Sequence, residues 1–352
     1  MRIGIISTLE NGIWGGCDQL WLKAAESAVA DGDVVAISLS RGPDTISRTS
    51  GLVTNGVTLF WRGAPKGIPW RLRRKLKKIL ISSRLSLLRV AGLWWRRRSS
   101  VLKDFFAWKP DVVIVNLSDI YDCFRMSDLE PELVRSGVPY LTITHAAIDF
   151  DLPEEDMRVV TRRVQCGANA ACFVALGTQR LVERHLACAL PNARIVRNPV
   201  NIDDWSPMPM PQSDTAQFAF VGRLDNLSKG LDLLFEALSS EDWQSRNWRL
   251  TLYGEGGDQE YLEQLAALYR IDKKIVFAGY ATDVRAVWEQ AQMLLLPSRT
   301  ESAPIVLVEA MLCGRPAVVT DVGGITEWAR EPDTAFVAEG ASVYSIRRAL
   351  ER

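Results

Sequence analysis

The sequence has few of the residues that build metal centres and disulfide frameworks. Its 352 residues include six cysteines and only two histidines, His145 and His185. No two cysteines form a Cys-x-x-Cys pair, so neither a structural zinc site nor a disulfide framework is expected. We therefore predict that the chain holds no metal and that its thiols are reduced, as in a cytoplasmic protein.

Long apolar runs are also missing. No stretch approaches the ~20 apolar residues that cross a bilayer, and the opening MRIGIISTLE lacks the apolar region of a secretory signal. We therefore expect a cytoplasmic location. A hydrophobic content of 47% with 24% charged residues is ordinary for a folded chain, which excludes disorder for most of it.

The charges balance over the whole chain but not locally. There are 42 Lys and Arg against 42 Asp and Glu, yet residues 45–103 contain 15 of the basic residues and none of the acidic ones. Within this stretch Leu72, Leu76 and Leu80 recur at helical spacing beside basic residues. This pattern is typical of a helix on an anionic membrane surface, so we expect residues 69–103 to contact the inner face of a membrane. A solvated amphipathic helix is the alternative. Nucleic acid is not expected as a partner, because no nucleic-acid recognition module accompanies the basic residues.

Strand-like and helix-like segments alternate along both halves of the chain. Near-continuous apolar runs such as Asp-Val-Val-Ile-Val at 111–115 are typical of parallel strands covered on both faces. Four prolines between 199 and 211 separate the halves, because proline continues neither a helix nor a central strand. The predicted fold is α/β, with Rossmann-like doubly wound domains at 1–199 and 200–352. Strands are expected within Arg2–Ser7, Val34–Ser38, Leu52–Trp61, Phe218–Val221, Arg249–Tyr253 and Met293–Leu296.

A glycine and two basic residues follow the first strand of the second half. The strand ends in Val221-Gly222-Arg223, and Lys229-Gly230 precedes a helix. Glycine allows a ligand to approach the backbone closely, and folds of this class bind ligands beyond the carboxyl ends of their strands. A guanidinium and an ammonium in that position suit a diphosphate. Ordinary surface charges are the alternative.

Two glutamates flank the start of a later helix. Glu301 ends a loop, Pro304 suits the first helical turn, and Glu309 lies farther along the helix. A helix N-terminus exposes unpaired N–H groups that favour anions. Carboxylates accept hydrogen bonds from hydroxyls, so the combination suggests a sugar beside a phosphate. The alternatives are a capping carboxylate at Glu301 and a solvated helix face at Glu309. Ile305, Val308 and Leu312 are expected to form the buried stripe of this helix.

Taken together, these motifs resemble the retaining GT-B glycosyltransferases of family 4, the glycosyl transferases group 1. In the first half, Trp14-Gly15-Gly16 resembles the glycine loop of that family, and His145 ends a strand where the family often has an active-site histidine. His185 is expected on the surface of a helix. The segments of the second half that carry the resemblance, in the order of the family, are Val221-Gly-Arg-Leu with Lys229-Gly, Tyr253-Gly-Glu-Gly, Val276-Phe-Ala-Gly279, Pro297-Ser with Glu301 and Glu309, Gly314-Arg-Pro, and Val322-Gly-Gly-Ile-Thr-Glu327.

The resemblance implies retaining transfer of a sugar from a UDP-, GDP- or ADP-linked donor to a glycan or lipid-linked acceptor, by two domains facing across a cleft. It implies no obligatory metal or cofactor beyond the donor. Arg223 and Lys229 would stabilise the diphosphate, Glu301 would contact the transferred sugar, His145 would line its pocket, and Glu309 would bind the ribose. The implied donor-binding set also includes Gly15, Gly16, Gly279 and the backbone of Ser302, Ala303, Pro304 and Ile305.

Two departures from the family pattern keep other hypotheses open. Many members have Gly-Phe or Phe-Gly after the first glutamate, where this sequence has Ser302-Ala303-Pro304. Members also usually continue with one or two helices beyond the point where this sequence ends. The second hypothesis is therefore a non-catalytic GT-B-like protein that binds a nucleotide sugar or scaffolds a membrane complex. A sugar-nucleotide epimerase of the same architecture is the third.

Overall fold

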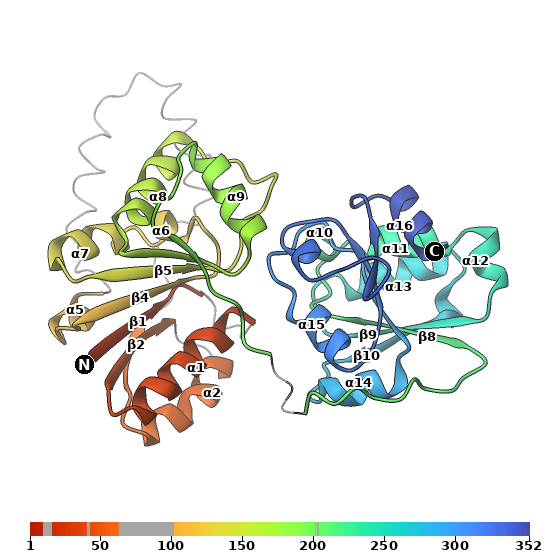
Figure 1. The fold of residues 1–352 in the computed structure, drawn as a ribbon, viewed down its shortest axis with the longest axis horizontal. Coiled ribbons are helices and arrows are strands. Elements are labelled where there is room, and N and C mark those ends of the chain that lie inside the picture. Colours follow the sequence, from red (N-terminus) through yellow and green to blue (C-terminus); the bar gives the residue numbers. More distant parts are fainter. Residues whose placement is uncertain (10–15, 41–42, 63–101, 201, 203) are drawn as a thin grey trace. The chain divides into compact units, whose positions relative to one another are not determined.

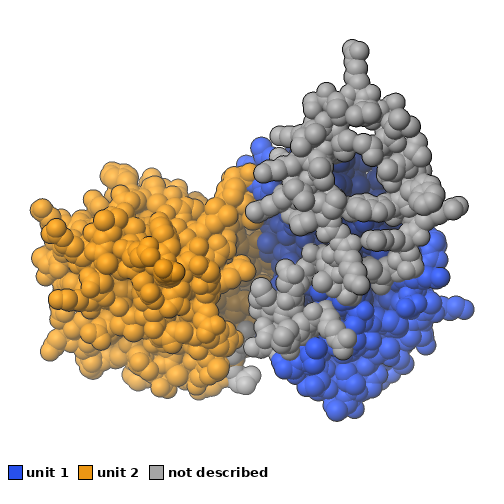
Figure 2. Space-filling model, turned by 180° about the vertical axis from the view of Figure 1, so that it is seen from behind, with its two compact units in different colours: residues 1–147, 151–173, 182–196 blue, residues 148–150, 174–181, 197–352 orange. Residues whose placement is uncertain are grey.

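The computed structural model describes residues 1–9, 16–40, 43–62, 102–200, 202 and 204–352 (Figure 1). Gly15 and most of the predicted membrane-facing segment 69–103 lie outside these ranges. The chain forms two compact units, coloured separately in Figure 2. Unit 1 comprises Met1–Ala147, Asp151–Phe173 and Val182–Val196, and unit 2 comprises Ile148–Phe150, Val174–Leu181 and Arg197–Arg352.

A seven-stranded parallel sheet forms the centre of unit 1, in the order β3-β2-β1-β4-β5-β6-β7. The order reverses at β1, as in a doubly wound fold. The strands are β1 (Arg2–Ser7), β2 (Val34–Ser40), β3 (Thr58–Arg62), β4 (Val112–Leu117), β5 (Tyr140–Thr144), β6 (Ala170–Phe173) and β7 (Ala193–Ile195). The helices are α1 (Gly16–Ala30), α2 (Pro43–Thr54), α5 (Lys103–Ala107), α6 (Asp122–Arg125), α7 (Leu129–Ser136), α8 (Glu155–Gly167) and α9 (Leu176–Leu186), of which the first part, up to Leu181, belongs to unit 2.

Successive side chains of β1 enter different hydrophobic clusters. Ile5 packs in a cluster with Trp21 and Ala25 of α1, whereas Ile6 packs in one with Leu129 of α7 and Val164 of α8. Figure 1 shows α1 and α2 on one face of the sheet and α7 and α8 on the other. Because side chains alternate between the faces of a strand, helices on both faces require an unbroken apolar run, as the sequence has.

Unit 2 repeats this design with a six-stranded parallel sheet in the order β10-β9-β8-β11-β12-β13. The order reverses at β8, so the crevice beyond the carboxyl ends of β8 and β11 is the expected ligand position. The strands are β8 (Ala216–Val221), β9 (Trp248–Tyr253), β10 (Ile275–Gly279), β11 (Met293–Leu296), β12 (Ala317–Thr320) and β13 (Ala335–Ala338). The helices are α10 (Asn226–Lys229), α11 (Leu231–Leu238), α12 (Glu241–Ser245), α13 (Gln259–Leu268), α14 (Val284–Gln290), α15 (Ile305–Leu312) and α16 (Val343–Leu350).

Two of the connecting segments have a defined structure. The segment Leu52–Trp61 holds a strand, as predicted, at its end: its first residues end α2, Gly56 turns the chain with φ of +85°, and β3 begins at Thr58. The proline-rich segment is anchored to unit 2 by the fully buried Arg315, which donates to the carbonyl oxygens of Met208 at 3.0 Å and Pro209 at 2.8 Å. No described helix has the length and hydrophobicity needed to cross a membrane.

Candidate functional site

The second-half motif residues gather beyond the carboxyl ends of parallel strands in unit 2. Arg223 and Lys229 follow β8, on what we call the basic loop (residues 222–232). Glu301 follows β11, on the glutamate loop (residues 297–301). Since β8 and β11 are paired neighbours, the topology brings together these two loops, which are far apart in the chain. This is the place at which a doubly wound sheet binds its ligand.

An ion pair joins the two loops. The Lys229 ammonium contacts Oε1 of Glu301, and the side chains are only 19% and 11% exposed. The same carboxylate oxygen accepts a hydrogen bond of 3.0 Å from the hydroxyl of Ser298. Thr320, at the end of β12, donates in turn to the Ser298 carbonyl oxygen at 2.6 Å. Lys229 and Glu301 are therefore held in one half-buried polar cluster.

The loops approach so closely that glycine is required. A Cβ atom on Gly230 would lie 2.4 Å from the carbonyl oxygen of Pro297, and one on Gly323 would lie 1.5 Å from that of Glu301. Their φ angles of +63° and +59° also lie in the left-handed region, which side chains disfavour. Main chain therefore packs directly on main chain around the glutamate loop.

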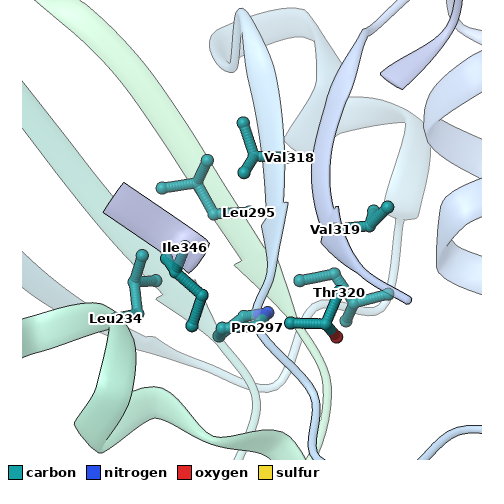
Figure 3. A pocket seen from close by; sticks show the side chains of 8 residues that line it. Leu234, Leu295, Pro297, Val318, Val319, Thr320 and Ile346 are labelled. Atoms are coloured by element: carbon teal, nitrogen blue, oxygen red, sulfur yellow. The ribbon is translucent and has the colours of Figure 1, made fainter. Parts of the chain in front are cut away.

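The glutamate loop begins beside a small and mostly apolar recess. Figure 3 shows this recess next to Pro297, with Leu295 of β11, Val318 of β12 and Ile346 of α16 in its lining. None of the side chains that line it is charged. The recess therefore supports the loop from the core and is not itself suited to bind a diphosphate.

The start of α15 differs in part from expectation. Pro304 precedes the helix and has no N–H, so within 302–305 only Ser302, Ala303 and Ile305 have amides to donate. Glu309 is 4% exposed, and so it does not lie on a solvated helix face. The predicted buried stripe was also wrong. Ile305, Val308 and Leu312 are all only half-buried, and the buried apolar side chains of the helix are Leu307 and Ala310.

The other predicted donor-binding residues that the structure describes lie just after a strand, at the end of a strand and at the start of a helix. The Arg223 side chain is 63% exposed and lies 3.7 Å from the carboxylate of Asp225. Gly279 ends β10 with φ of +72° and has open space where a Cβ atom would be. Gly16, in unit 1, is the first residue of α1. Their predicted roles in donor binding stay predictions.

His145 directly follows β5, at the carboxyl edge of the sheet of unit 1. Its Nε2 lies 2.8 Å from Oδ1 of Asn116, which belongs to β4. Its Nδ1 is buried and has no hydrogen-bond partner among the described residues. Burial lowers the pKa of the imidazole to about 4, so the ring is neutral at pH 7. In the described part of the chain, this neutral ring therefore uses only one of its two nitrogens in a hydrogen bond.

We expect an NMR titration to show His145 neutral down to about pH 4, the pKa that its burial gives. In the unfolded chain the His145 imidazole takes up a proton near pH 6.5, whereas in the folded chain it is still neutral at that pH. The free energy of unfolding therefore falls as the pH is lowered from about 6.5 toward 4. His145→Gln identifies the signal, because the chain has only two histidines. An imidazole pKa close to the ordinary value would contradict the burial of His145.

The partners of two groups of residues in unit 1 were not predicted. His185 was predicted on a helix surface but is 3% exposed, and its Nδ1 lies 2.6 Å from the hydroxyl of Tyr121. Arg125 pairs with Asp119 at 2.7 Å and Asp122 at 3.0 Å, and burial raises the pKa of Asp119 to about 6. The only sequence signal for these groups was the place of residues 119–125 after β4, and it did not specify their partners.

Comparison with known proteins supports the second half most strongly. The family described as Glycosyl transferases group 1 matches residues 215–352, which include Arg223, Lys229, Glu301 and Glu309. The predicted resemblance to that family is therefore confirmed for this part of the chain.

Several relatives share sequence with parts of the chain. Lipopolysaccharide 1,6-galactosyltransferase of Escherichia coli (strain K12) is 30% identical over 224 residues, which cover 61% of this chain and 57% of that protein. The human phosphatidylinositol N-acetylglucosaminyltransferase has one subunit that is 30% identical over 160 residues, covering 45% and 32%. An uncharacterized glycosyltransferase of Methanocaldococcus jannaschii is 34% identical over 118 residues, covering 33% and 30%. The matched regions thus span between about a third and somewhat over half of these relatives.

Solved structures resemble the whole chain. The apo form of the lipopolysaccharide outer core galactosyltransferase WaaB has a TM-score of 0.67 at 18% identity, covering 100% of this chain and 90% of that one. Anabaena HepE in complex with UDP has a TM-score of 0.70 at 15% identity, with the same coverage. The predicted fold class is confirmed: both units are Rossmann-like α/β domains, and these structural neighbours are GT-B glycosyltransferases.

Proposed function

We propose that the chain is a retaining glycosyltransferase of family 4 that moves a sugar from a nucleotide-sugar donor to an acceptor. The observation that carries the proposal is the pairing of Lys229 with Glu301 beyond β8 and β11, within the region that matches glycosyl transferases group 1. The ammonium suits phosphate oxygens, and the carboxylate suits sugar hydroxyls. The fold binds ligands at this edge.

In the proposed mechanism, Lys229 and Arg223 stabilise the negative charge that develops on the departing nucleoside diphosphate. Glu301 holds the transferred sugar, with His145 in the sugar pocket and Glu309 on the ribose. The bond from the anomeric carbon to the phosphate oxygen breaks while the acceptor hydroxyl attacks from the same face. The departing phosphate takes the proton of that hydroxyl. This route needs no protein nucleophile, because the acceptor attacks the anomeric carbon directly. It needs no metal, because the two basic residues supply the positive charge.

The proposed donor is a UDP-, GDP- or ADP-linked sugar, and the acceptor is a glycan or a lipid-linked precursor. Structures of HepE with UDP and with UDP-glucose support a UDP-linked sugar as the donor, by analogy of fold. The names of two relatives, a lipopolysaccharide galactosyltransferase and a phosphatidylinositol glycosyltransferase, support a lipid-linked acceptor. We further propose a cytoplasmic location, with attachment to an anionic membrane through residues 69–103.

Donor binding is tested most directly by thermal stability against UDP, GDP and ADP. A ligand at a hundred times its dissociation constant raises the free energy of unfolding by about 2.7 kcal/mol. We expect one of the three to raise the melting temperature by several degrees, with the matching nucleoside at the same concentration as the control. No shift with any of the three would argue against the proposed function.

Turnover separates an enzyme from a non-catalytic binding protein. The nucleotide that stabilises the chain identifies the donor series, and the corresponding sugar nucleotides are then incubated with the protein and with lipid-linked acceptors. Transfer, or slow release of the free sugar, supports the enzyme. Binding of the donor without either reaction supports the non-catalytic alternative.

A further inference from the structure

Arg299 stands two residues before Glu301 and forms the second ion pair between the two loops. Its guanidinium contacts both carboxylate oxygens of Asp232, with Nη1 to Oδ1 at 2.6 Å and Nη2 to Oδ2 at 2.7 Å. The two side chains are only 27% and 23% exposed. A planar guanidinium bound through two parallel hydrogen bonds fixes orientation as well as distance.

Arg299 also holds the main chain of the basic loop. Its Nη1 donates to the carbonyl oxygen of Asn226 at 2.9 Å, and its backbone N–H donates to that of Ser228 at 2.8 Å. The next amide, of Thr300, donates to the same Ser228 oxygen at 3.2 Å. These bonds reach the residues just before Lys229, whereas Asp232 lies just after it. The turn that carries the lysine is thus held on both sides by one arginine.

The two ion pairs differ in what a ligand does to them. A diphosphate that binds the Lys229 ammonium competes with Glu301, so donor binding weakens the ion pair between Lys229 and Glu301. The Arg299 pair contains no group assigned to the ligand, and it therefore persists. Burial alone would raise the pKa of Asp232, but the hydrogen bonds and charge of Arg299 bring that pKa below its usual value. The carboxylate therefore stays ionised at neutral pH.

We propose that Arg299 is a positioning residue for the phosphate-binding lysine: its pair with Asp232 keeps the basic loop in register with the glutamate loop while Lys229 exchanges Glu301 for the diphosphate. The proposal rests on the proposed function of the site. It assigns Arg299 and Asp232 no contact with the donor and no part in the bond-forming step.

A double-mutant cycle on nucleotide affinity tests this role. The probe is UDP, or GDP or ADP if one of these stabilises the wild type instead, and the dissociation constant is measured by calorimetry. We expect Arg299→Met to weaken binding about tenfold, which is roughly the effect of losing one charge-assisted hydrogen bond. Arg299→Lys retains the charge but not the planar fork, and we expect it to recover part of the loss.

The decisive comparison is made in a Lys229→Met background. If Arg299 acts through the lysine, Arg299→Met changes the affinity less than about twofold once Lys229 is gone, because coupled residues are not additive. A tenfold loss in both backgrounds would show a merely structural role and overturn the proposal, as would unchanged affinity of Arg299→Met in the wild-type background.

Two further measurements keep this proposal separate from the function on which it rests. Arg246→Met, which removes an exposed ion pair with Glu351 of 2.6 Å in the same unit, is the control and leaves affinity unchanged. A wild-type chain that binds none of the three nucleotides would overturn the proposed function itself, and this inference with it.

Discussion

Lys229→Met and Glu301→Gln are each expected to lower sugar transfer by at least about a hundredfold. Loss of one preorganised group at a developing charge costs roughly 2.7–4 kcal/mol of transition-state stabilisation. Lys229 is less exposed than Arg223, the other predicted phosphate ligand of the basic loop, and Glu301 shares its polar cluster. The measurement is kcat/KM with the donor found by thermal stabilisation.

Each of these single variants leaves a charge without its partner, so folding must be checked separately. Removing both partners of a partly buried pair is usually less harmful to stability than removing one. The double variant Lys229→Met with Glu301→Gln is therefore the matched control: we expect it to be inactive yet nearly as stable as the wild type. Near-normal transfer by either single variant would disprove the assigned roles.

Arg315→Met is expected to lower the free energy of unfolding by about 3 kcal/mol, because it removes a buried guanidinium that serves three carbonyl oxygens, one of them in a buried hydrogen bond. Arg315 is 2% exposed and donates to the carbonyl oxygens of Met208, Pro209 and, through Nε at 2.8 Å, Trp288. Denaturation in urea provides the measurement. Faster hydrogen exchange at the amides next to residues 208–210 would confirm that the segment has been released.

Arg285→Met is the matched control for this prediction. Arg285 also contacts the segment that precedes β8, through an ion pair of 2.9 Å with Asp204. The Asp204 side chain, however, is 57% exposed. Ion pairs open to solvent contribute about 1 kcal/mol or less. Equal destabilisation by the two variants would show that burial of Arg315 has no special effect.

Much of the fold is predictable because its periodic signals are strong. Arg2–Ser7 and Met293–Leu296 have the predicted bounds, since short apolar runs mark them clearly. The loops of the donor side were also predictable, because Gly222-Arg223 and Lys229 follow a strand end. Parallel pairing brings such ends to one edge of the sheet.

Other features depend on contacts that the sequence does not show. The helix α15, with sequence Ile-Val-Leu-Val-Glu-Ala-Met-Leu, is apolar almost all round, so its rotation cannot be read from periodicity and the solvated alternative for Glu309 could not be excluded from the sequence. The sequence does not distinguish Arg299 from an ordinary loop residue, because its partner Asp232 lies 67 positions earlier in the chain. His185 likewise depends on Tyr121, which is 64 positions away.

The glycine contacts at Gly230 and Gly323 have a consequence for altering this protein. The backbones meet there with no room for side chains, and the ion pairs of Lys229 and Arg299 join the two loops, so side chains that point outward have little part in the course of the loops. Leu227 and Tyr280, which are 65% and 63% exposed and follow the carboxyl ends of β8 and β10, contribute little to that packing. Libraries that vary such outward side chains while keeping both glycines would explore new donors on an unchanged scaffold.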